Sequence, residues 1–389
     1  MQYITDPRSG NKLSILGFGC MRFPRDSDKT EKLILTAIES GVNYFDTAYV
    51  YGNSEITLGG ILHKNNVREK IYLATKLPWQ KCKNYDDFDR LFEAQLGRLK
   101  TGYIDYYLIH NISDTESWKK LCELGIEKWI AEKKSSGLIR QLGFSFHGPR
   151  ESFLALLDIY NWDFCQIQYN YMDENYQAGR TGLKKAHEKG LPVIIMEPLL
   201  GGKLATGLPA AALKIFTGTG ETRSAASWAL RWLWNQPEVT VVLSGMNAAD
   251  QLTDNLKTAE TATPGMLQEK EAAVYRPVIA ALREAYKVPC TGCNYCMPCP
   301  QGVDIPNCFA AYNTSYAMGY VSGLTLYVTS TGVNNPEKNH SARKCVKCGA
   351  CEQKCPQHIE VSKSMTAAAK RLEPFWFRGI MWLVRKILR

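Results

Sequence analysis

The chain has 389 residues, more than one ordinary hydrophobic core accommodates, so we expect two domains. Hydrophobic residues make up 45% and charged residues 22%, a composition typical of a soluble globular protein. The formal net charge is +9, but residues 363–389 alone carry seven Lys/Arg and one Glu. The body of the chain is therefore near neutral, and we expect no nucleic-acid partner.

The first twelve residues are polar and lack the apolar stretch of a signal peptide. No stretch reaches the roughly 18 apolar residues that a transmembrane helix needs. Eight of the thirteen cysteines lie in two runs near the C-terminus. The other five are scattered and odd in number, which argues against a disulfide framework and for a reducing cytoplasm; they are Cys20, Cys82, Cys122, Cys165 and Cys308.

Short β-rich runs alternate with helical patterns over the first 260 residues. Eight strands are predicted: 14–19, 44–47, 71–76, 104–110, 139–145, 164–168, 193–197 and 240–244. This alternation predicts a (β/α)8 barrel, whose chemistry lies at the carboxyl ends of the strands. A doubly wound sheet is the alternative, but it needs a Gly-x-Gly-x-x-Gly turn after the first strand. That turn is absent, because Gly19 leads into Met21-Arg22-Phe23-Pro24.

Local signals mark several of the helices between these strands. Asp28 and Glu31 have the spacing of a capping box, and Gly41 follows the helix they begin. Acidic residues at 86, 87 and 89 predict the start of another helix. Gly137 and Gly190 are predicted to end two more.

Four polar residues lie at or just after consecutive predicted strands: Asp46, Tyr51, Lys76 and His110. A phenol has a reference pKa of about 10, and a neighbouring ammonium group lowers it. A carboxylate would hold that ammonium group charged and in place. An imidazole can donate a hydrogen bond to a carbonyl oxygen that gains charge. The four residues therefore predict a proton-transfer site at the mouth of the barrel.

Three segments resemble the aldo-keto reductase family: FDTAYVYGNSEITLG (45–59), IYLATKLPW (71–79) and YIDYYLIHNI (103–112). The similarity extends through LGFSFHG (142–148), CQIQYN (165–170), MEPLLGGKL (196–204) and VLSGMNAADQLTDNL (242–256). The resemblance implies a catalytic tetrad of Asp46, Tyr51, Lys76 and His110. It also implies NAD(P) bound in an extended form across the barrel mouth without a Rossmann fold.

By the same resemblance, Ser145 and Gln166 would hold the nicotinamide carboxamide. Phe146 replaces the Asn that usually follows this Ser, and Met196 occupies the place of an aromatic residue that stacks on nicotinamide. The full set of residues implied to bind the cofactor is Gly19, Met21, Ser145, Gln166, Met196, Pro198, Leu199, Gly201, Ser244, Gly245, Gln251 and Asn255.

The adenosine end departs from the members of the family that prefer NADPH. Those members carry a Lys and an Arg that pair with the 2′-phosphate, whereas this chain has Gly245 and Gln251 at the matching positions. Losing both cations removes strong charge-assisted hydrogen bonds. We therefore expect NAD(H) to be slightly favoured over NADP(H).

The two cysteine runs give the clearest signal in the chain. Each is a Cys-x-x-Cys-x-x-Cys segment closed by Cys-Pro, and the runs span 290–300 and 345–356. This is the pattern of two-cluster ferredoxins, in which the fourth Cys of each run binds the other cluster. The pattern predicts one 4Fe-4S cluster on Cys290, Cys293, Cys296 and Cys355, and a second on Cys345, Cys348, Cys351 and Cys299.

Structural zinc and disulfides are the alternative interpretations of these runs. Zinc sites usually use four ligands as two pairs, not two runs of four that end in Cys-Pro. The 45 residues between Cys299 and Cys345 are many for a compact bacterial ferredoxin. The segment resembles the mostly helical ferredoxin domains of succinate dehydrogenase iron–sulfur subunits.

The predicted organisation has four parts: a barrel over 1–262, a connecting helix over 263–287, a small two-cluster domain over 288–365 and a basic tail over 366–389. In the tail, 375–389 has basic residues on one side of a helix and apolar residues on the other. Such a helix either packs on the protein or lies in an anionic membrane surface. In the second case the protein would be peripherally bound at the inner face of the membrane.

These observations predict a cytoplasmic iron–sulfur oxidoreductase that moves hydride between a nicotinamide cofactor and a small carbonyl or alcohol substrate. Hydride carries two electrons, whereas each cluster passes one, so the clusters would serve a redox partner protein, a flavin or only the structure. No flavin motif is present. The alternative hypothesis is a flavin-linked or ferredoxin-type electron-transfer protein whose barrel is a docking module.

Overall fold

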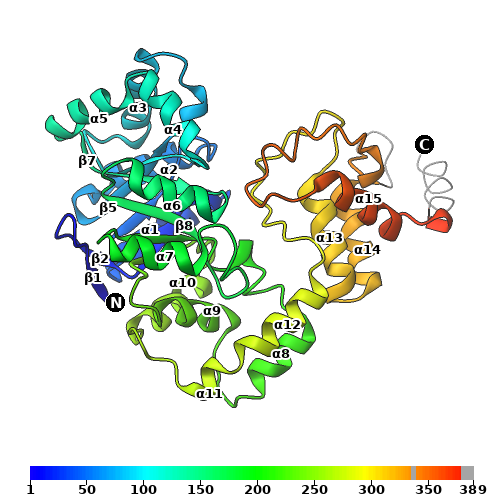
Figure 1. Ribbon diagram of the computed structural model, residues 1–389. Helices are drawn as coiled ribbons and strands as arrows, with labels where there is room; N and C mark the ends of the chain where they lie inside the picture. The colour runs from blue at the N-terminus through cyan, green and yellow to red at the C-terminus, as the bar shows by residue number, and fades with distance from the viewer. Residues whose placement is uncertain (334–338, 378–389) are drawn as a thin grey trace. The chain divides into compact units, whose positions relative to one another are not determined.

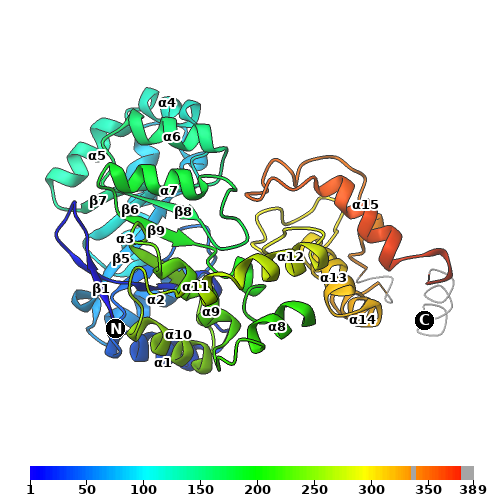
Figure 2. The same ribbon diagram turned by 60° about the horizontal axis from the view of Figure 1, so that its bottom comes forward.

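The computed structural model describes residues 1–333 and 339–377 (Figures 1 and 2). Contacts within the chain divide it into two compact units. The first contains Met1–Leu199 and Ala226–Leu267, and the second contains Leu200–Ala225 and Gln268–Arg389. The segment 200–225 falls within the range predicted for the barrel domain, but its contacts group it with the C-terminal part of the chain.

Eight parallel strands of the first unit close into a barrel. They are β3 (Leu16–Gly19), β4 (Tyr44–Asp46), β5 (Tyr72–Leu77), β6 (Ile104–Ile109), β7 (Ile139–Phe146), β8 (Phe164–Gln168), β9 (Val193–Met196) and β10 (Val241–Ser244). Strand β10 pairs with β3 and completes the ring. The predicted barrel is therefore confirmed, and the doubly wound alternative is excluded because its sheet would have open edges.

Helices alternate with the strands and surround them (Figure 1). In this unit they are α1 (Ser27–Glu39), α2 (Ser54–Lys64), α3 (Asp86–Leu99), α4 (Thr115–Glu123), α5 (Ile126–Ser135), α6 (Arg150–Ile159), α7 (Gly179–Glu188), α9 (Ala225–Trp234) and α10 (Ala249–Glu260). The predicted acidic start of α3 is confirmed. Gly137 and Gly190 follow α5 and α7 with positive φ, as expected.

The capping box predicted for α1 is wrong. Asp26, not Asp28, is the N-cap, and its side chain accepts hydrogen bonds from the backbone N–H groups of Asp28 and Lys29. Glu31 forms an ion pair with Lys64 at 2.8 Å instead. A carboxylate two residues earlier satisfies the free N–H groups of the first turn equally well, so the helix begins sooner than predicted.

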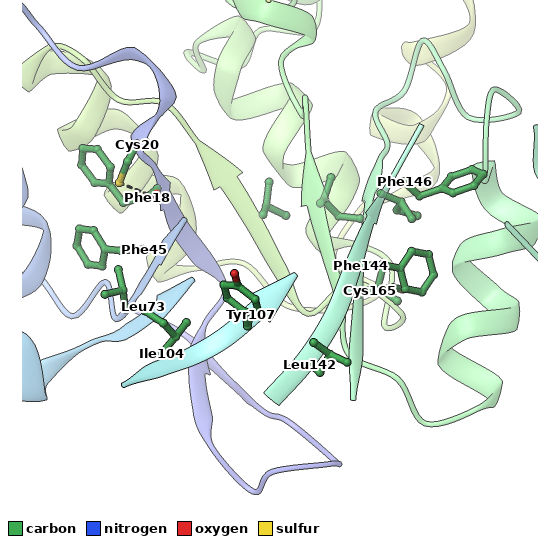
Figure 3. Close-up of a cluster of buried hydrophobic side chains, with 14 of the residues drawn as sticks. Phe18, Cys20, Phe45, Leu73, Ile104, Tyr107, Leu142, Phe144, Phe146 and Cys165 are labelled. Atoms are coloured by element: carbon green, nitrogen blue, oxygen red, sulfur yellow. Dashed lines mark hydrogen bonds between the residues drawn. The ribbon is translucent and has the colours of Figure 1, made fainter. Parts of the chain in front are cut away.

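Side chains along each strand alternate between the barrel interior and the surrounding helices. Tyr44 and Phe164 belong to the cluster that fills the interior. Phe45 and Tyr107 belong to the larger cluster shared with the helices, part of which Figure 3 shows along the strands. Asp46 lies two residues after Tyr44, so the same alternation directs its side chain into the interior.

A short N-terminal hairpin, β1 (Tyr3–Thr5) and β2 (Lys12–Ser14), was not predicted from the sequence. It carries Asp6, which is fully buried and accepts a hydrogen bond of 2.8 Å from the Tyr106 hydroxyl. The Tyr106 ring belongs to the interior cluster of the barrel. Packing therefore fills the interior below the carboxyl ends of the strands.

The regular secondary structure of the second unit, in the part that is described, consists of helices. It contains α8 (Ala210–Thr217), α11 (Glu269–Ala272), α12 (Tyr275–Ala285), α13 (Ile305–Ala317), α14 (Tyr320–Thr331) and α15 (Val361–Leu372). Helix α8 lies beside α12, and α13 beside α14 (Figures 1 and 2). A separate apolar core includes Phe309, Tyr327, Met365 and Leu372. The predicted small, mostly helical domain is confirmed.

The single connecting helix predicted over 263–287 is wrong, because two helices, α11 and α12, lie in this range. Gln268 and Glu271 form a capping box that begins α11 at Glu269. Pro277 has no N–H group and fits only the first turn of a helix, which places the start of α12 at Tyr275.

No helix within 1–333 or 339–377 is long and apolar enough to cross a membrane. The basic amphipathic helix predicted for the tail falls mainly on 378–389, outside the residues that the structure describes.

Candidate active site and cluster-binding cysteines

The four predicted catalytic residues come from three neighbouring strands. Asp46 is the last residue of β4, Lys76 is the next to last of β5, and His110 directly follows β6. Tyr51 lies in the turn that connects β4 to α2. Strands β4 to β6 are adjacent in the barrel, so parallel pairing brings these side chains to the same rim.

Lys76 and Asp46 form a buried ion pair. The Lys76 Nζ donates to Asp46 Oδ1 at 2.5 Å and to the Thr47 carbonyl at 2.7 Å. The Gln166 amide donates to Asp46 Oδ2 at 3.1 Å. Burial raises the pKa of Asp46 and lowers the pKa of Lys76, and the opposite charge of each partner offsets part of this effect.

Tyr51 and His110 lie beside this ion pair. The Lys76 Nζ is 5.2 Å from the centre of the Tyr51 ring. The centres of the Tyr51 and His110 rings are 5.9 Å apart, with the rings nearly perpendicular at 87°. Burial, followed by the positive charge of Lys76 and then by His147, holds the pKa of His110 well below its usual value. His110 is therefore neutral at neutral pH.

A second polar network fixes the strand that carries Lys76, and sequence reasoning missed it. Glu55 is buried on α2 and accepts hydrogen bonds from Thr75 at 2.7 Å and Gln95 at 2.8 Å. The same Gln95 amide donates to the Lys76 carbonyl at 3.1 Å. Arg98 pairs with Glu55 at 3.2 Å. The available signal was an acidic residue, Glu55, just before the apolar residues Leu58, Ile61 and Leu62.

The residues expected to hold nicotinamide lie on β7 to β9. The Ser145 hydroxyl is buried and accepts the Asn111 backbone N–H at 2.8 Å. Gln166 is also buried, and its Oε1 atom has no hydrogen-bond partner among the described residues. A buried amide oxygen without a partner is costly, and the NH2 group of a carboxamide would satisfy it. Met196, half-buried, ends β9. These residues fit a nicotinamide cofactor.

Five more of the implied cofactor residues lie around β3 and β10, the strands that close the barrel. Gly19 ends β3 and lies against the backbone of Ser244 and Gly245. Met21 follows in a short 3-10 helix. Asn255 on α10 donates to the Ser244 hydroxyl at 2.9 Å, and both side chains are buried. This hydrogen bond ties α10 to β10.

Gln251 is exposed on α10, and its side chain accepts the Asn247 N–H at 3.1 Å. Gly245 is also exposed. Pro198 and Leu199 lie just after β9, separated from it by Glu197, with Pro198 buried and Leu199 half-buried.

Gly201 belongs to the second unit, with a positive φ of 67°. A Cβ atom at Gly201 would overlap the carbonyl oxygen of Thr291, which lies between two cysteines of the first run. Packing within the second unit therefore requires glycine at this position.

The first set of predicted cluster ligands comes together in the second unit. Cys290, Cys293, Cys296 and Cys355 line one cavity with apolar neighbours that include Phe309. Burial, followed by the nearby thiols of Cys290, Cys293 and Cys355, raises the pKa of Cys296 to about 12. Cys355, from the second run, is thus a neighbour of Cys290, Cys293 and Cys296 from the first.

Three cysteines of the second set are neighbours in the same crossed manner. Burial contributes most to the raised pKa of Cys351, and the charge of Glu352 and the nearby Cys345 and Cys299 thiols contribute further. Cys348 is exposed, whereas the other cysteines of both runs are half-buried. None of the eight cysteines forms a disulfide within the described part of the chain.

Among the described residues, no three His, Cys, Asp or Glu side chains have the arrangement that binds a single metal ion. Four thiolates around a cubane bind four separate iron atoms, so they lie farther apart than the ligands of one zinc ion. The spacing of the two runs, each closed by Cys-Pro, matches the 4Fe-4S pattern, whereas structural zinc usually has four ligands in two pairs.

Two family models match the chain. Residues 15–264 match the aldo/keto reductase family, and residues 289–360 match a 4Fe-4S dicluster domain. The first match covers more than half of the sequence and the whole barrel. The chain belongs to the aldo/keto reductase family. The resemblance read from the sequence is thereby confirmed, together with the appended 4Fe-4S domain.

A solved structure similar to this aldo/keto reductase is that of AKR11C1 from Bacillus halodurans in its holo form. The two share 26% sequence identity with a TM-score of 0.58, over 72% of this chain and 96% of that chain. The uncharacterized oxidoreductase YrpG from Bacillus subtilis is 26% identical over 67% of this chain and 91% of its own length.

An aldo-keto reductase from Mycobacterium sp. (strain KMS) is 34% identical over 152 residues. That similarity covers 38% of this chain, and the chain spans about half of this relative, 51% of its length.

Proposed function

We propose that this aldo/keto reductase family oxidoreductase interconverts a carbonyl and an alcohol with a nicotinamide cofactor. The main support is the buried Lys76–Asp46 ion pair next to the Tyr51 ring, with the neutral ring of His110 perpendicular to that of Tyr51. When bound, nicotinamide would supply or accept the hydride. Asp46, Tyr51, Lys76 and His110 would be the catalytic residues.

In the reducing direction, the Tyr51 hydroxyl would donate its proton to the carbonyl oxygen of the substrate. The ammonium group of Lys76 favours the resulting phenolate, because an opposite charge nearby stabilises an ionised group. Asp46 keeps Lys76 in position through their 2.5 Å contact. Neutral His110 would donate a hydrogen bond that orients the carbonyl. Alcohol oxidation would use the same residues in reverse.

Cofactor recognition would use the unpartnered Oε1 of Gln166 and the hydroxyl of Ser145 for the carboxamide. The remaining cofactor residues implied by the family would line the rest of the site. NADH would bind at least as well as NADPH, because Gly245 and Gln251 carry no charge for a 2′-phosphate. A bound flavin is supported only by the difference between two-electron hydride transfer and the one-electron chemistry of the clusters.

The 4Fe-4S domain would hold two clusters through the crossed sets of cysteines. Bound clusters would exchange single electrons with a partner protein. The grouping of Cys296 with Cys355, and of Cys351 with Cys299, supports this ligand assignment. About eight iron atoms per chain, measured on protein purified without oxygen, would agree with it.

Substituting Tyr51 with Phe tests the proposed catalytic role. The change removes only the hydroxyl group, so carbonyl reduction should fall by at least about 100-fold, the scale of general acid catalysis. NADH binding, followed by fluorescence titration, should stay within about twofold of the original, well under 1.4 kcal/mol. Tyr49→Phe in the same connection is the matched control. Near-normal turnover of Tyr51→Phe would rule out the tetrad.

A further inference from the structure

The two cysteine runs differ in charge. Residues 290–303 contain no charged side chain. Residues 343–354 contain Arg343, Lys344, Lys347 and Lys354, with Glu352 as the one acidic residue. The two runs share the Cys-x-x-Cys-x-x-Cys spacing, and the second has one more residue before its fourth Cys. That small difference in ligand spacing does not explain the difference in charge.

The charges of the second run remain available to a partner. Lys344, Lys347 and Lys354 are exposed, and no ion pair involves them among the described residues. Arg343 is partly neutralised by Glu373 at 3.7 Å. Glu352 is half-buried and accepts the Ser362 backbone N–H at 2.7 Å, so it faces its own chain. The exposed charge of residues 343–354 is thus mainly that of three lysines.

The same surface contains the exposed cysteine. Cys348 lies next to Lys347 in sequence and is exposed, unlike the other seven proposed ligands. Val346, with 61% of its surface exposed, adds an apolar residue between the lysines. Electron-transfer complexes tend to have small, weak interfaces, and opposite charges steer the partners toward each other. An exposed ligand, an apolar side chain and a basic rim match that type of contact.

We propose that residues 343–354, the basic face, dock an acidic one-electron carrier protein next to Cys348. This inference rests on the proposed function, since it takes Cys348 as a ligand of the second cluster. It adds which cluster meets the partner and which charge the partner carries. Residues 290–303 of the first run, three of whose thiols line an apolar cavity, contribute no charged side chain of their own. An anionic membrane is a weaker fit, because Val346 alone offers little apolar area for insertion.

Binding of two acidic probes to the full chain with its clusters tests the basic face. The probes are a purified flavodoxin and a purified acidic two-cluster ferredoxin, titrated by calorimetry at low and at 0.2 M salt. We expect binding at low salt that weakens at least tenfold at high salt, because screening reduces attraction between exposed charges. Lys347→Glu with Lys354→Glu should weaken binding at least tenfold.

Lys214→Glu with Lys270→Glu is the matched control, since both lysines are exposed in the same unit and the net charge changes equally. Its binding should match that of the unchanged protein. Lys347→Gln with Lys354→Gln should give an intermediate loss. Iron content and the visible spectrum must stay unchanged, which separates lost docking from lost clusters.

The docking surface would be overturned if neither probe bound the unchanged protein. It would also be overturned if Lys214→Glu with Lys270→Glu weakened binding as much as Lys347→Glu with Lys354→Glu. Lysine-dependent binding to anionic liposomes without binding to either protein would overturn it as well. Carbonyl reduction with NADH should be unchanged in Lys347→Glu with Lys354→Glu. A failure of the unchanged protein to reduce carbonyls would contradict the proposed function and leave the binding result to decide the docking surface separately.

Discussion

The buried pair of Lys76 and Asp46 is the residue-scale feature on which the site depends. Taking two charges out of water is costly, and their attraction compensates only with good geometry and further hydrogen bonds. The Thr47 carbonyl and the Gln166 amide supply those bonds. Removing one partner of such a pair typically costs about 3–5 kcal/mol, because the other charge stays buried. A buried ion pair is therefore better explained by a functional role of its charge, such as the proposed effect of Lys76 on Tyr51, than by a gain in stability.

The low pKa of His110 predicts a pH-dependent loss of stability. Below about pH 6.5 the unfolded chain binds a proton at this imidazole, whereas the folded chain keeps it neutral because of burial, Lys76 and His147. Stability contributed by this site is therefore lost as the pH falls below that value, by up to about 1.4 kcal/mol per pH unit.

Urea unfolding of the unchanged protein and of His110→Gln, between pH 7.5 and 5, measures this loss. The difference in unfolding free energy between them should shift in favour of His110→Gln as the pH falls. A difference that does not depend on pH would show that His110 titrates normally in the folded protein.

Gln251 allows a test of cofactor choice at a single position. Replacing it with Arg would place a cation where NADPH-preferring relatives carry one, and a charge-assisted hydrogen bond to phosphate is strong. We expect Gln251→Arg to tighten NADPH binding about tenfold, or about 1.4 kcal/mol, with NADH binding unchanged. Fluorescence titration with both cofactors measures this, with Gln251→Leu as the control.

A tenfold preference of the unchanged protein for NADPH would contradict the assignment of Gly245 and Gln251 to the phosphate pocket. It would point to another cation near that pocket, such as Lys257 on α10.

At the scale of elements, helix α2 links the turn carrying Tyr51 to the network that supports Lys76. Glu55 lies in the first turn of this helix, and Leu58 and Leu62 are buried against the barrel. Helix α2 packs closely on α3, where the backbone of Arg98 and Leu99 approaches Gly59. The position of the turn that carries Tyr51 therefore depends on a helix contact that tolerates no side chain at residue 59.

Two neighbouring glycines in α2 give opposite predictions. A Cβ atom at Gly59 would overlap the backbone at the end of α3, whereas one at Gly60 would meet nothing within 4 Å. We expect Gly59→Ala to destabilise the protein by about 1–3 kcal/mol through overpacking. Gly60→Ala should stabilise it by up to about 1 kcal/mol, because alanine favours helix. Urea unfolding curves of both variants check this, and equal effects would contradict the close contact.

Eight strands and their order could be predicted because each is a short apolar run between helical patterns with clear stop signals. The grouping of Asp46, Tyr51, Lys76 and His110 could also be predicted, because polar residues at strand ends are brought together by a barrel. The N-terminal hairpin was missed, because three-residue strands carry little pattern. The start of α1 was misplaced because Asp26 and Asp28 are both good caps. Glu55 was missed, because its partners Thr75 and Gln95 come from other elements.

At the scale of the whole molecule, the chain combines a barrel with a helical unit that has its own apolar core. The segment 200–225 joins the second unit although it lies between β9 and α9 of the barrel. Within that unit, the Tyr286 hydroxyl donates to the Gly207 carbonyl, and Lys203 donates to the Val288 carbonyl at 3.5 Å. No pattern in the sequence predicts this grouping, because it depends on contacts between distant residues.

The proposed crossed ligation in the second unit can be tested by substituting a single cysteine. The thiol of Cys355 lies with the first run, and that of Cys299 lies with the second. Cys355→Ser should therefore alter the cluster of the first run, even though its sequence neighbours belong to the second. Electron paramagnetic resonance of the dithionite-reduced protein reports each cluster separately once reference variants are available.

Cys293→Ser and Cys348→Ser provide those references, because each lies in the middle of one run. We expect the spectrum of Cys355→Ser to match that of Cys293→Ser, and the spectrum of Cys299→Ser to match that of Cys348→Ser. The reverse matching would mean that each run binds its own cluster with four local ligands. In that case Cys355 would have to leave the apolar cavity that it shares with Cys290, Cys293 and Cys296, and the packing of Phe309 and Val361 around that cavity would have to change as well.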